Sequence, residues 1–514
     1  MTKQPSFKRA VYWAYAMYWG GKGFAAAFAF FLAAILGPRD FGVVALAMVY
    51  IAFVQMILDQ GLSAAVIQRK DLKPEHLDAV FWLNVGLSLV LIALTMVVSG
   101  WWARANHLPE LRLVVYVLSS ILLIEALAKV QRAVLQKEMD FRSLAIRSNG
   151  SVVAGGIVGL TMALKGYGVW ALVGQRLCED SAALVLLWSV GHWRPRLRFS
   201  LAHLKDLLGF SMTTLVNNIG DWAYSQADAA FMGMFFGPVA VGLFRLAQRL
   251  VSMVLDTGTN PLQYVSFSEF SRLQDRPAEL RRSVLRCLKL ASVITFPALA
   301  GLAFTSRELV AVLGDKWGPA AGALTILSAF GITYAVSKFT GPLLMARGKP
   351  HVLAILTWSV NLVGIGTVLA AAIFLRGVSV ERQVLGIAAA RLAVGACLMA
   401  PVYLFFLLRT AGITIRGLLR ATGPSTMAAI TTALSVWTLN ATGLVATVRP
   451  AGHLAVDVIV GGAAGIGTLL ASDRELLTNV RDLIGRVLRP ANASPEAGGR
   501  VPVPTSAQAG EVLD

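Results

Sequence analysis

Apolar stretches of about twenty residues, separated by short polar or charged segments, recur along almost the whole chain of 514 residues. A helix that crosses a hydrocarbon core about 30 Å thick needs about twenty mostly apolar residues. The pattern therefore predicts an all-α polytopic membrane protein with about fourteen transmembrane helices. They are predicted at 14–36, 41–65, 79–99, 112–130, 145–164, 168–190, 208–236, 238–262, 287–305, 319–341, 351–375, 384–408, 418–439 and 453–471.

Composition agrees with a membrane protein. Apolar residues make up 56% of the chain and charged residues 14%, whereas a soluble domain carries about 25% charged residues. Cys178, Cys287 and Cys397 fall in or beside apolar segments without a CxxC pair, which argues against both a disulfide framework and a zinc site. We expect no cofactor and no metal.

The positions of the basic residues predict how the chain is oriented in the membrane. The chain has 46 Lys and Arg against 28 Asp and Glu, a net charge of +18. With the N-terminus in the cytoplasm, most of them fall in the cytoplasmic loops, so the positive-inside rule predicts that both termini are cytoplasmic. They recur at every second loop instead of forming one stripe with interleaved aromatics, which argues against nucleic-acid binding.

The sequence contains an internal repeat. The segment LGPRDFGVVALA (36–47) matches FGPVAVGLFRLA (236–247) with a constant offset, and each lies at the turn between the first and second helix of a group of six. Six crossings return the chain to the same side, so the two groups should be related by an axis along the membrane normal, with a cleft between them as in alternating-access transporters. The predicted organisation is an N-lobe at 1–206, a C-lobe at 207–409, two further helices at 410–472 and a disordered cytoplasmic tail at 473–514.

Polar residues gather on one face of two adjacent predicted helices. Asp221 and Asp228 share a face of the seventh helix, and Arg245 and Arg249 share a face of the eighth. Equal distances from the intervening turn put Asp228 level with Arg245, which predicts a salt bridge between them. Such a pair is either structural or part of a binding site.

Further ionisable residues lie inside other predicted spans, where each costs several kcal/mol without a partner or an aqueous cavity. Arg176 and Asp180 are spaced to neutralise each other at i, i+4, whereas Lys22 and Arg249 have no carboxylate at i±3 or i±4. Interior cations suit a phosphate-bearing head group. Asp221 and Asp228 are alternatively candidates for ion coupling. The remaining interior polar residues are Glu179, Lys338 and Arg391.

Several segments resemble a known family. LGPRDFGVVALAMVYIAFVQMILDQGLSAAVIQRKDL, LQKEMDFRSLA, KGYGVWALV, NPLQYVSFSEFSRLQDRPAELRR and GDKWGPAAGALTILSAFGI occur in order within residues 7 to 410. They resemble Wzx-type polysaccharide flippases of the multidrug/oligosaccharidyl-lipid/polysaccharide superfamily. The resemblance implies a transporter of the bacterial cytoplasmic (inner) membrane that moves an undecaprenyl-pyrophosphate-linked oligosaccharide between leaflets, for exopolysaccharide, O-antigen or capsule synthesis, ahead of polymerase and export machinery. It also implies cavity cations, a role that carries over to Lys22, Arg245, Arg249 and Lys338.

Two alternatives stay open. A cation-coupled multidrug antiporter of the same superfamily would use the carboxylates and leave the cations incidental. A polytopic glycan polymerase or ligase is disfavoured because the outside loops are only about a dozen residues long, and no HExxH or Ser/His/Asp cluster is present, so we expect no enzyme. The apolar segments 418–439 and 453–471 have no counterpart in the repeat, and we expect them to form a lateral groove for a polyprenyl chain.

Overall fold

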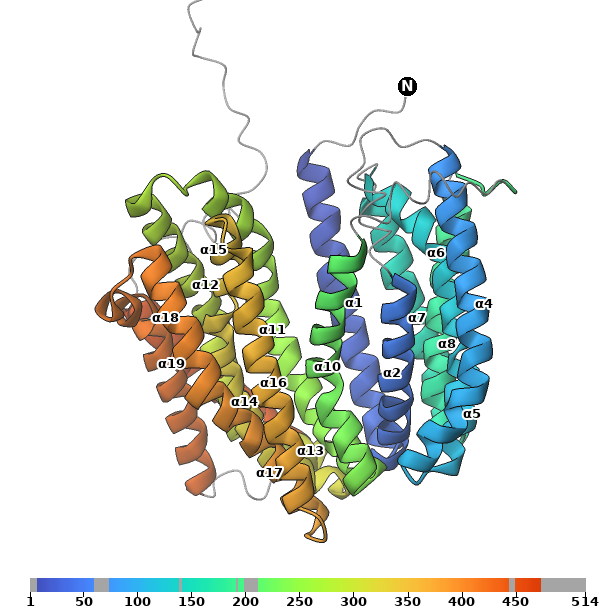
Figure 1. Cartoon of the computed structure of the whole chain (residues 1–514). Coiled ribbons are helices and arrows are strands. Elements are labelled where there is room, and N and C mark those ends of the chain that lie inside the picture. Colours follow the sequence, from blue (N-terminus) through green and yellow to red (C-terminus); the bar gives the residue numbers. More distant parts are fainter. Residues whose placement is uncertain are drawn as a thin grey trace, which may run out of the picture.

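The protein is described by a computed structural model that covers residues 7–59, 74–137, 141–190, 193–197, 211–442 and 449–472. In these ranges the chain forms helices and no strands (Figure 1). Each predicted apolar segment coincides with helix over its described residues. Three segments are interrupted, at Ser119 between α5 and α6, at Lys338–Phe339 between α14 and α15, and by a turn of π-helix, η2, between α17 and α18.

The first half of the chain forms the helices of the N-half. They are α1 (Phe7–Ile35), α2 (Pro38–Asp59), α4 (Pro74–Ala105), α5 (Pro109–Leu118), α6 (Ser120–Lys137), α7 (Phe141–Leu164) and α8 (Val169–Val190).

The C-half follows, and two further helices end the described chain. The C-half comprises α10 (Ser211–Phe236), α11 (Pro238–Arg272), α12 (Pro277–Phe304), α13 (Ser306–Leu313), η1 (Asp315–Ala320), α14 (Ala321–Ser337), α15 (Thr340–Ala346), α16 (Pro350–Phe374), α17 (Val380–Val394), η2 (Gly395–Met399) and α18 (Ala400–Ala411). The last two helices are α19 (Ile415–Ala441) and α20 (Pro450–Ser472).

Proline sets many of the helix starts. Seven of these helices begin with proline, including α2 at Pro38 and α11 at Pro238. Proline fits the first position of a helix because its missing N–H would have no intrahelical partner there and its fixed φ suits the helix. Gly237, just before α11, has a φ of +86°, a conformation that glycine adopts without strain. The chain therefore reverses direction tightly between α10 and α11.

The outer surface is apolar, as a bilayer requires. Val97 is 78% exposed, Ile459 68% and Phe374 84%, and many other large apolar side chains of the described helices are exposed as well. Water-soluble domains rarely carry extensive apolar surface. By length and composition, nine helices among the described residues qualify as membrane spans. The protein is thus a multi-pass membrane protein, and the count of fourteen spans stays a prediction.

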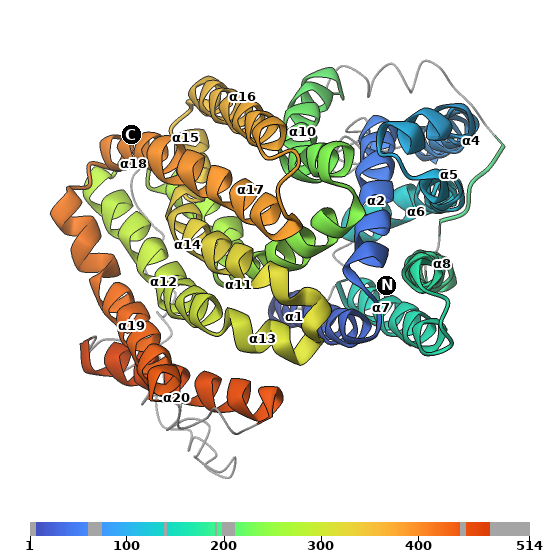
Figure 2. The same cartoon turned by 90° about the horizontal axis from the view of Figure 1, so that it is seen from below.

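The two halves lie side by side, with α10 between them at the front in Figure 1. We call the end that carries the α1–α2 and α10–α11 turns the turn end; it lies at the bottom of Figure 1, opposite the marked N-terminus. Helices α2 and α11 cross closely there, as the view from that end shows (Figure 2).

The crossing is reciprocal. A side chain at Gly42 would overlap the carbonyl group of Pro238, and one at Gly242 would overlap the carbonyl group of Pro38. The repeated Gly-Pro turns thus pack against each other through equivalent positions, as expected of two units related by a pseudo-twofold axis. This observation gives the sequence repeat a structural meaning, because the glycines permit the two backbones to touch.

The segment after α13 reinforces the turn end. The Nζ of Lys316 donates to the carbonyl oxygens of Ala34 and Ile35, at 2.9 and 3.0 Å, and Nε1 of Trp317 donates to the carbonyl of Ala33 at 2.7 Å. These are carbonyls of the last turn of α1, which have no intrahelical partners and favour a cation. A C-half segment therefore caps an N-half helix.

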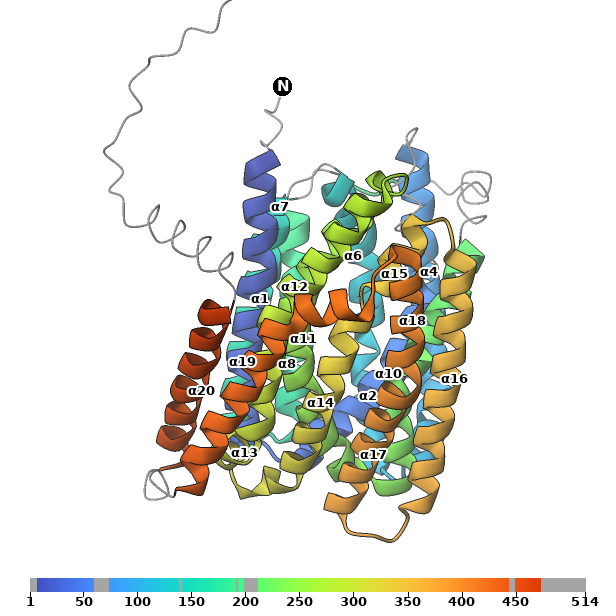
Figure 3. The same cartoon turned by 90° about the vertical axis from the view of Figure 1, so that its left-hand side faces the viewer.

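Helices α19 and α20 stand outside this pair of halves. Figure 3 shows them packed beside α12, with α20 outermost. Ser292 of α12 donates to Ser425 of α19 at 3.0 Å in a buried contact. Thr432 of α19 donates to the carbonyl of Gly461 in α20 at 3.1 Å. Small residues and hydroxyl bonds are typical contacts between membrane helices.

Candidate functional site: a cavity between the halves

A cavity of about 570 Å³ lies where the C-half faces the N-half, and all of its lining residues except Ala29 of α1 and Phe41 of α2 belong to the C-half. Its wall comes from six helices, α1, α2, α10, α11, α14 and α17, and α11 contributes more lining residues than any other helix. Most polar lining residues come from α10 and α11, as the two polar faces in the sequence predict, and Tyr334 of α14 and Arg391 of α17 add to them. Those of α10 and α11 are Tyr224, Ser225, Gln226, Asp228, Arg245, Gln248, Arg249 and Ser252.

Arg245 is held by amides. Its Nη1 donates to Oε1 of Gln248 at 2.8 Å, one turn along α11, and its Nη2 makes a short hydrogen bond to Oε1 of Gln226 in α10. Neutral partners orient the guanidinium without cancelling its charge. Arg245 therefore presents a fixed positive charge in the cavity wall.

Arg249 lies one turn farther from the turn end. Its Nη2 donates to the carbonyl of Ala25 in α1 at the long distance of 3.5 Å, and the opposing charge that acts on it is that of Glu179 in α8. Among the described residues it forms no ion pair. Most of its hydrogen-bonding capacity therefore remains open to a ligand.

Lys22 and Lys338 both pair with Asp256. Lys22 of α1 approaches Oδ2 of Asp256 in α11 at 3.3 Å, and Lys338 approaches Oδ1 at 3.8 Å. Lys338 also donates to Thr259 and Asn260, at 3.1 Å each. This cluster joins the two halves about 10 Å from Arg249, given the helical rise between residues 249 and 256. This shared partner could not be predicted from the sequence, because Asp256 lies far from both lysines along the chain.

The predicted Asp228–Arg245 salt bridge is wrong. Asp228 is fully buried and pairs with Arg391 of α17, whose Nε and Nη2 both lie 2.8 Å from its carboxylate oxygens. The same guanidinium donates to the carbonyl of Tyr224 at 2.9 Å and stacks over the Tyr224 ring at 4.2 Å. Equal distance from the turn between α10 and α11 does not determine which neighbouring helix Asp228 faces.

The other predicted polar residues have different positions. Arg176 and Asp180 form the expected i, i+4 pair, with Nε and Oδ2 2.8 Å apart, which confirms that part of the analysis. Glu179 lies on the same helix, and it acts on Arg249 through its charge. Asp221 belongs to α10, but its side chain lies outside the described residues.

A second cavity of about 320 Å³ adjoins the first and shares Tyr224 and Tyr334 with it. Tyr403, Gln263 and Lys338 also line it. Hydroxyl, amide and ring groups of this kind bind sugars by hydrogen bonds and by stacking on ring faces. Sequence reasoning missed Gln226, Tyr334 and Tyr403, since a single amide or tyrosine in an apolar helix carries no periodic signal.

The cavity wall thus presents the guanidinium groups of Arg245 and Arg249, with two ammonium groups nearby and an adjoining cavity lined by polar and aromatic side chains. Such a set suits a ligand with a phosphate-type anion and a sugar-like polar part. The fold and the cavity define the class: an all-helical, multi-pass membrane protein with a cationic cavity between two halves.

Comparison with known proteins identifies the family. Residues 31–322 match the model of the family described as "Polysaccharide biosynthesis protein". The match covers more than half of the chain, and the chain belongs to this family.

Individual relatives share just over a quarter of their residues with this chain in the matched region. The teichuronic acid biosynthesis protein TuaB of Bacillus subtilis (strain 168) is 28% identical over 302 residues, which cover 58% of this chain and 62% of TuaB. The lipopolysaccharide biosynthesis protein WzxC of Escherichia coli (strain K12) is 28% identical over 326 residues, 62% of this chain and 65% of WzxC. The matched region thus spans less than two thirds of either relative.

Solved structures share the fold. A structure titled "Lipid II flippase MurJ, inward closed conformation" superposes with a TM-score of 0.68 at 12% identity, covering 92% of this chain and 100% of that chain. An inward-facing multidrug resistance MATE transporter of the MOP superfamily gives 0.60 at 16% identity, over 78% of this chain and 98% of its own. At these identities the likeness concerns the fold alone, and it agrees with the all-helical polytopic class predicted from the sequence.

Proposed function

We propose that this protein is a transporter that moves an undecaprenyl-pyrophosphate-linked oligosaccharide across the membrane by alternating access, and that it is not an enzyme. The observation that carries the proposal is the cavity between the halves, whose wall presents Arg245 and Arg249 with Lys22 and Lys338 beyond them. The family, and relatives named for teichuronic acid and lipopolysaccharide biosynthesis, support a polysaccharide pathway.

The cations would bind the pyrophosphate. Arginine grips a phosphate with two parallel hydrogen bonds, and this geometry is stronger in a low-dielectric cavity than in water. A pyrophosphate would also compete with Asp256 for Lys22 and Lys338. Since that cluster joins α1 to α11, substrate binding would loosen a link between the halves.

The positions of the contacts support a transport cycle. The halves touch at the turn end, whereas the Lys22 side chain, on the other side of the cavity, is 51% exposed. With both termini in the cytoplasm, as the positive-inside rule predicts, the turn end faces the periplasm and the cavity is accessible from inside. The substrate would enter there, and rocking of the N-lobe (1–206) against the C-lobe (207–409) would open the turn end.

The lipid tail would stay at the side of the molecule. A groove of about 470 Å³ runs between α12, α19 and α20 and is lined largely by apolar residues, including Ile294, Pro297, Val436, Val458 and Ile466. Its position supports the expectation that the last two helices receive a polyprenyl chain. Delivery to a polymerase and export machinery in the inner membrane would follow translocation.

The antiporter alternative has less support. It requires a carboxylate that is free to titrate, and Asp228 is held by Arg391 on three short contacts. Ion coupling through Asp228 or Asp221 is therefore a secondary proposal, in which the Asp228–Arg391 pair would open during the cycle.

Arg249 provides the test of the proposed function. In a deletion strain of the source organism, lipid extracts analysed by mass spectrometry should show accumulated polyprenyl-linked oligosaccharide, and the wild-type gene should remove it. Arg249→Ala should leave the accumulation, because losing a charge-assisted hydrogen bond costs about 1.5–3 kcal/mol, roughly ten- to hundredfold in efficiency. Arg249→Lys, which keeps the charge but not the paired geometry, should be intermediate.

Arg416→Ala is the matched control, since Arg416 is an exposed arginine at the start of α19 and not part of the cavity wall. It should complement fully at equal protein abundance in the membrane. Unchanged lipid pools in the deletion strain would remove the proposed function, whereas full rescue by Arg249→Ala would remove only the role of this residue.

A further inference from the structure

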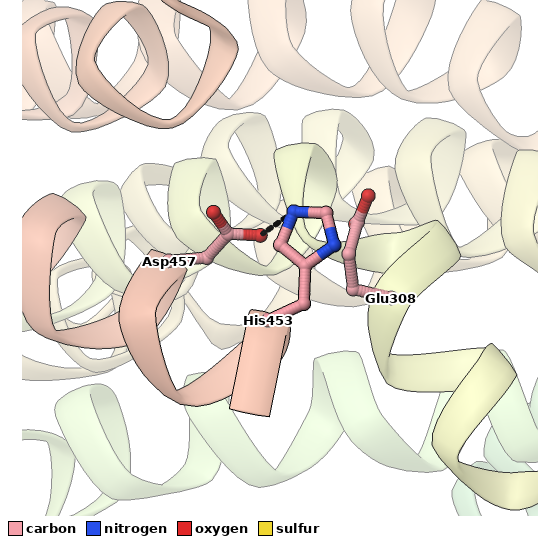
Figure 4. Close-up of side chains that lie close together, drawn as sticks. All are labelled: Glu308, His453 and Asp457. Carbon is pink, nitrogen blue, oxygen red and sulfur yellow. Dashed lines mark ion pairs between the residues drawn. The ribbon is translucent and has the colours of Figure 1, made fainter. Parts of the chain in front are cut away.

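A cluster of potential metal ligands lies at the turn end, outside the cavity. Glu308 of α13, His453 of α20 and Asp457 of α20 each place one ligand atom within 4.8 Å of the others. Figure 4 shows the His453 imidazole between the two carboxylates. The cluster could not be predicted from the sequence, because its residues come from two distant segments and His453 and Asp457 show only the common i, i+4 spacing.

Among the described residues, no lysine or arginine balances the charge of this cluster. Asp457 is fully buried, and within the described chain neither of its carboxylate oxygens accepts a hydrogen bond of 3.5 Å or less. The polar side chains that act on it favourably are those of His453 and Asn440. Oε2 of Glu308 is buried and equally without a hydrogen bond. No Lys or Arg of the described residues forms an ion pair with either carboxylate, and the segment 443–448 between α19 and α20 has no charged residue in its sequence. A protonated His453 would balance only one of these two carboxylates, of which Asp457 is buried and Glu308 partly buried, so a divalent cation fits the charge of the cluster better.

The ligand chemistry indicates the kind of cation. Nε2 of His453 lies 3.7 Å from Oδ2 of Asp457, and two ligands of a tetrahedral Zn²⁺ with bonds of about 2.0–2.1 Å are roughly 3.3 Å apart. Small side-chain rotations would therefore close the site. Imidazole and carboxylate together suit Zn²⁺ and similar divalent transition metals, and two carboxylates balance the charge of such an ion.

Asn440 supplies the remaining polar group. Its Oδ1 lies within hydrogen-bond distance, 2.7 Å, of Nε2 of His453. This is the same nitrogen that faces Asp457. Metal binding at Nε2 would displace this hydrogen bond and leave the amide oxygen as a neighbour of the ion. His453, whose side chain is 20% exposed, gives the ion access from the turn-end side.

We propose that Glu308, His453 and Asp457 form a binding site for a divalent transition metal ion that ties α13 to α20. The segment that follows α13 caps α1 through Lys316 and Trp317. The ion would thus connect the outer helix α20 to the segment that holds the turn end closed.

Zinc titration of the purified full-length protein tests the site. Protein in detergent, without a polyhistidine tag and stripped by chelator, should bind one equivalent of Zn²⁺ in isothermal titration calorimetry. His453→Gln should abolish this equivalent, and Glu308→Gln should weaken it at least tenfold. Co²⁺ should give visible d–d bands in the wild type that disappear in the same two variants.

Matched controls separate this site from incidental binding. His351→Gln and Glu381→Gln remove an exposed histidine and an exposed carboxylate elsewhere and should leave the bound equivalent unchanged. The two site variants alter partly exposed side chains, so they are expected to fold, as a single elution peak on size exclusion would verify. A wild-type protein that takes up neither metal, or uptake that survives in both site variants, would overturn the proposal. Neither result bears on the transport proposal, which needs no metal.

Discussion

Asp228 and Arg391 show how a charge is kept deep inside the protein. Asp228 is fully buried, yet both carboxylate oxygens receive hydrogen bonds from one guanidinium, which also donates to the carbonyl of Tyr224. A paired and hydrogen-bonded charge costs far less to bury than an isolated one. The pair lies in the wall of the cavity beside Arg245. It leaves Arg245 and Arg249 as the cations that face a ligand.

Breaking this pair should destabilise the protein. Asp228→Asn leaves the Arg391 charge buried without a counter-charge, and Arg391→Gln does the same to Asp228. Removing one partner of a buried pair costs about 3–5 kcal/mol. We expect a clear fall in the unfolding temperature of the detergent-solubilised protein for either single variant.

The double variant Asp228→Asn/Arg391→Gln is the control, since an amide pair leaves no charge buried and retains hydrogen bonding. It should recover a large part of the lost stability, and the coupling follows from the double-mutant cycle. Additive losses in the double variant would contradict a direct pair.

Sequence reasoning reached the residue level only where the interaction is local. The Arg176–Asp180 pair follows from helical spacing alone and is confirmed. The partner of Asp228 is 163 positions away along the chain, and depth in the membrane does not say which helix faces it. The shared partner of Lys22 and Lys338 was out of reach for the same reason, because helix neighbours are set by packing of the whole bundle.

At the scale of the elements, the crossing of α2 and α11 depends on two equivalent glycines. Backbone contact at Gly42 and Gly242 brings the first turns of both helices together at the turn end. The repeat in the sequence predicted equivalent turns. It did not predict that the two turns touch. Two turns related by a twofold axis can lie at any distance from that axis, and therefore from each other.

Adding a methyl group at this crossing should separate the helices. Gly42→Ala and Gly242→Ala each place a Cβ against a proline carbonyl, and overpacking of this kind costs about 1–3 kcal/mol. We expect both variants to lower the unfolding temperature by a similar amount, because the two sites are equivalent.

Gly366→Ala provides the comparison. Gly366 lies within α16, and nothing lies within 4 Å of an added Cβ there. Alanine is the better helix former by about 1 kcal/mol, so this variant should be unchanged or more stable. Equal destabilisation by all three alanines would point to a general loss of helix flexibility instead of a close crossing.

In the molecule as a whole, two layers of contacts lie between the cavity and the surface at the turn end. The inner layer is the α2–α11 crossing, and the outer layer is the segment after α13, whose Lys316 and Trp317 cap α1. Trp317 is fully buried and packs edge-on against Phe41, with ring centroids 5.4 Å apart. Phe41 also lines the cavity. A change in this outer layer therefore acts directly on the cavity wall.

Trp317→Phe should open the turn end more often. The substitution keeps an aromatic ring but removes the Nε1–H that donates to Ala33, and a buried carbonyl left without its donor costs about 1–3 kcal/mol. Because this bond exists only while the C-half segment caps α1, its loss should shift the population toward the open conformation by roughly five- to hundredfold.

A reporter cysteine in the cavity wall makes this shift measurable. With Cys178, Cys287 and Cys397 replaced, Ser252→Cys places one thiol in the cavity, and a membrane-impermeant maleimide added from the turn-end side should label it severalfold faster in Trp317→Phe. Trp101→Phe, at a tryptophan that is 57% exposed near the same end of α4, should leave the rate unchanged. Faster labelling in Trp317→Phe alone would mean that closure of this end depends on a C-half segment holding an N-half helix. Equal rates would place the barrier entirely in the α2–α11 crossing, where Gly42→Ala should then accelerate labelling instead.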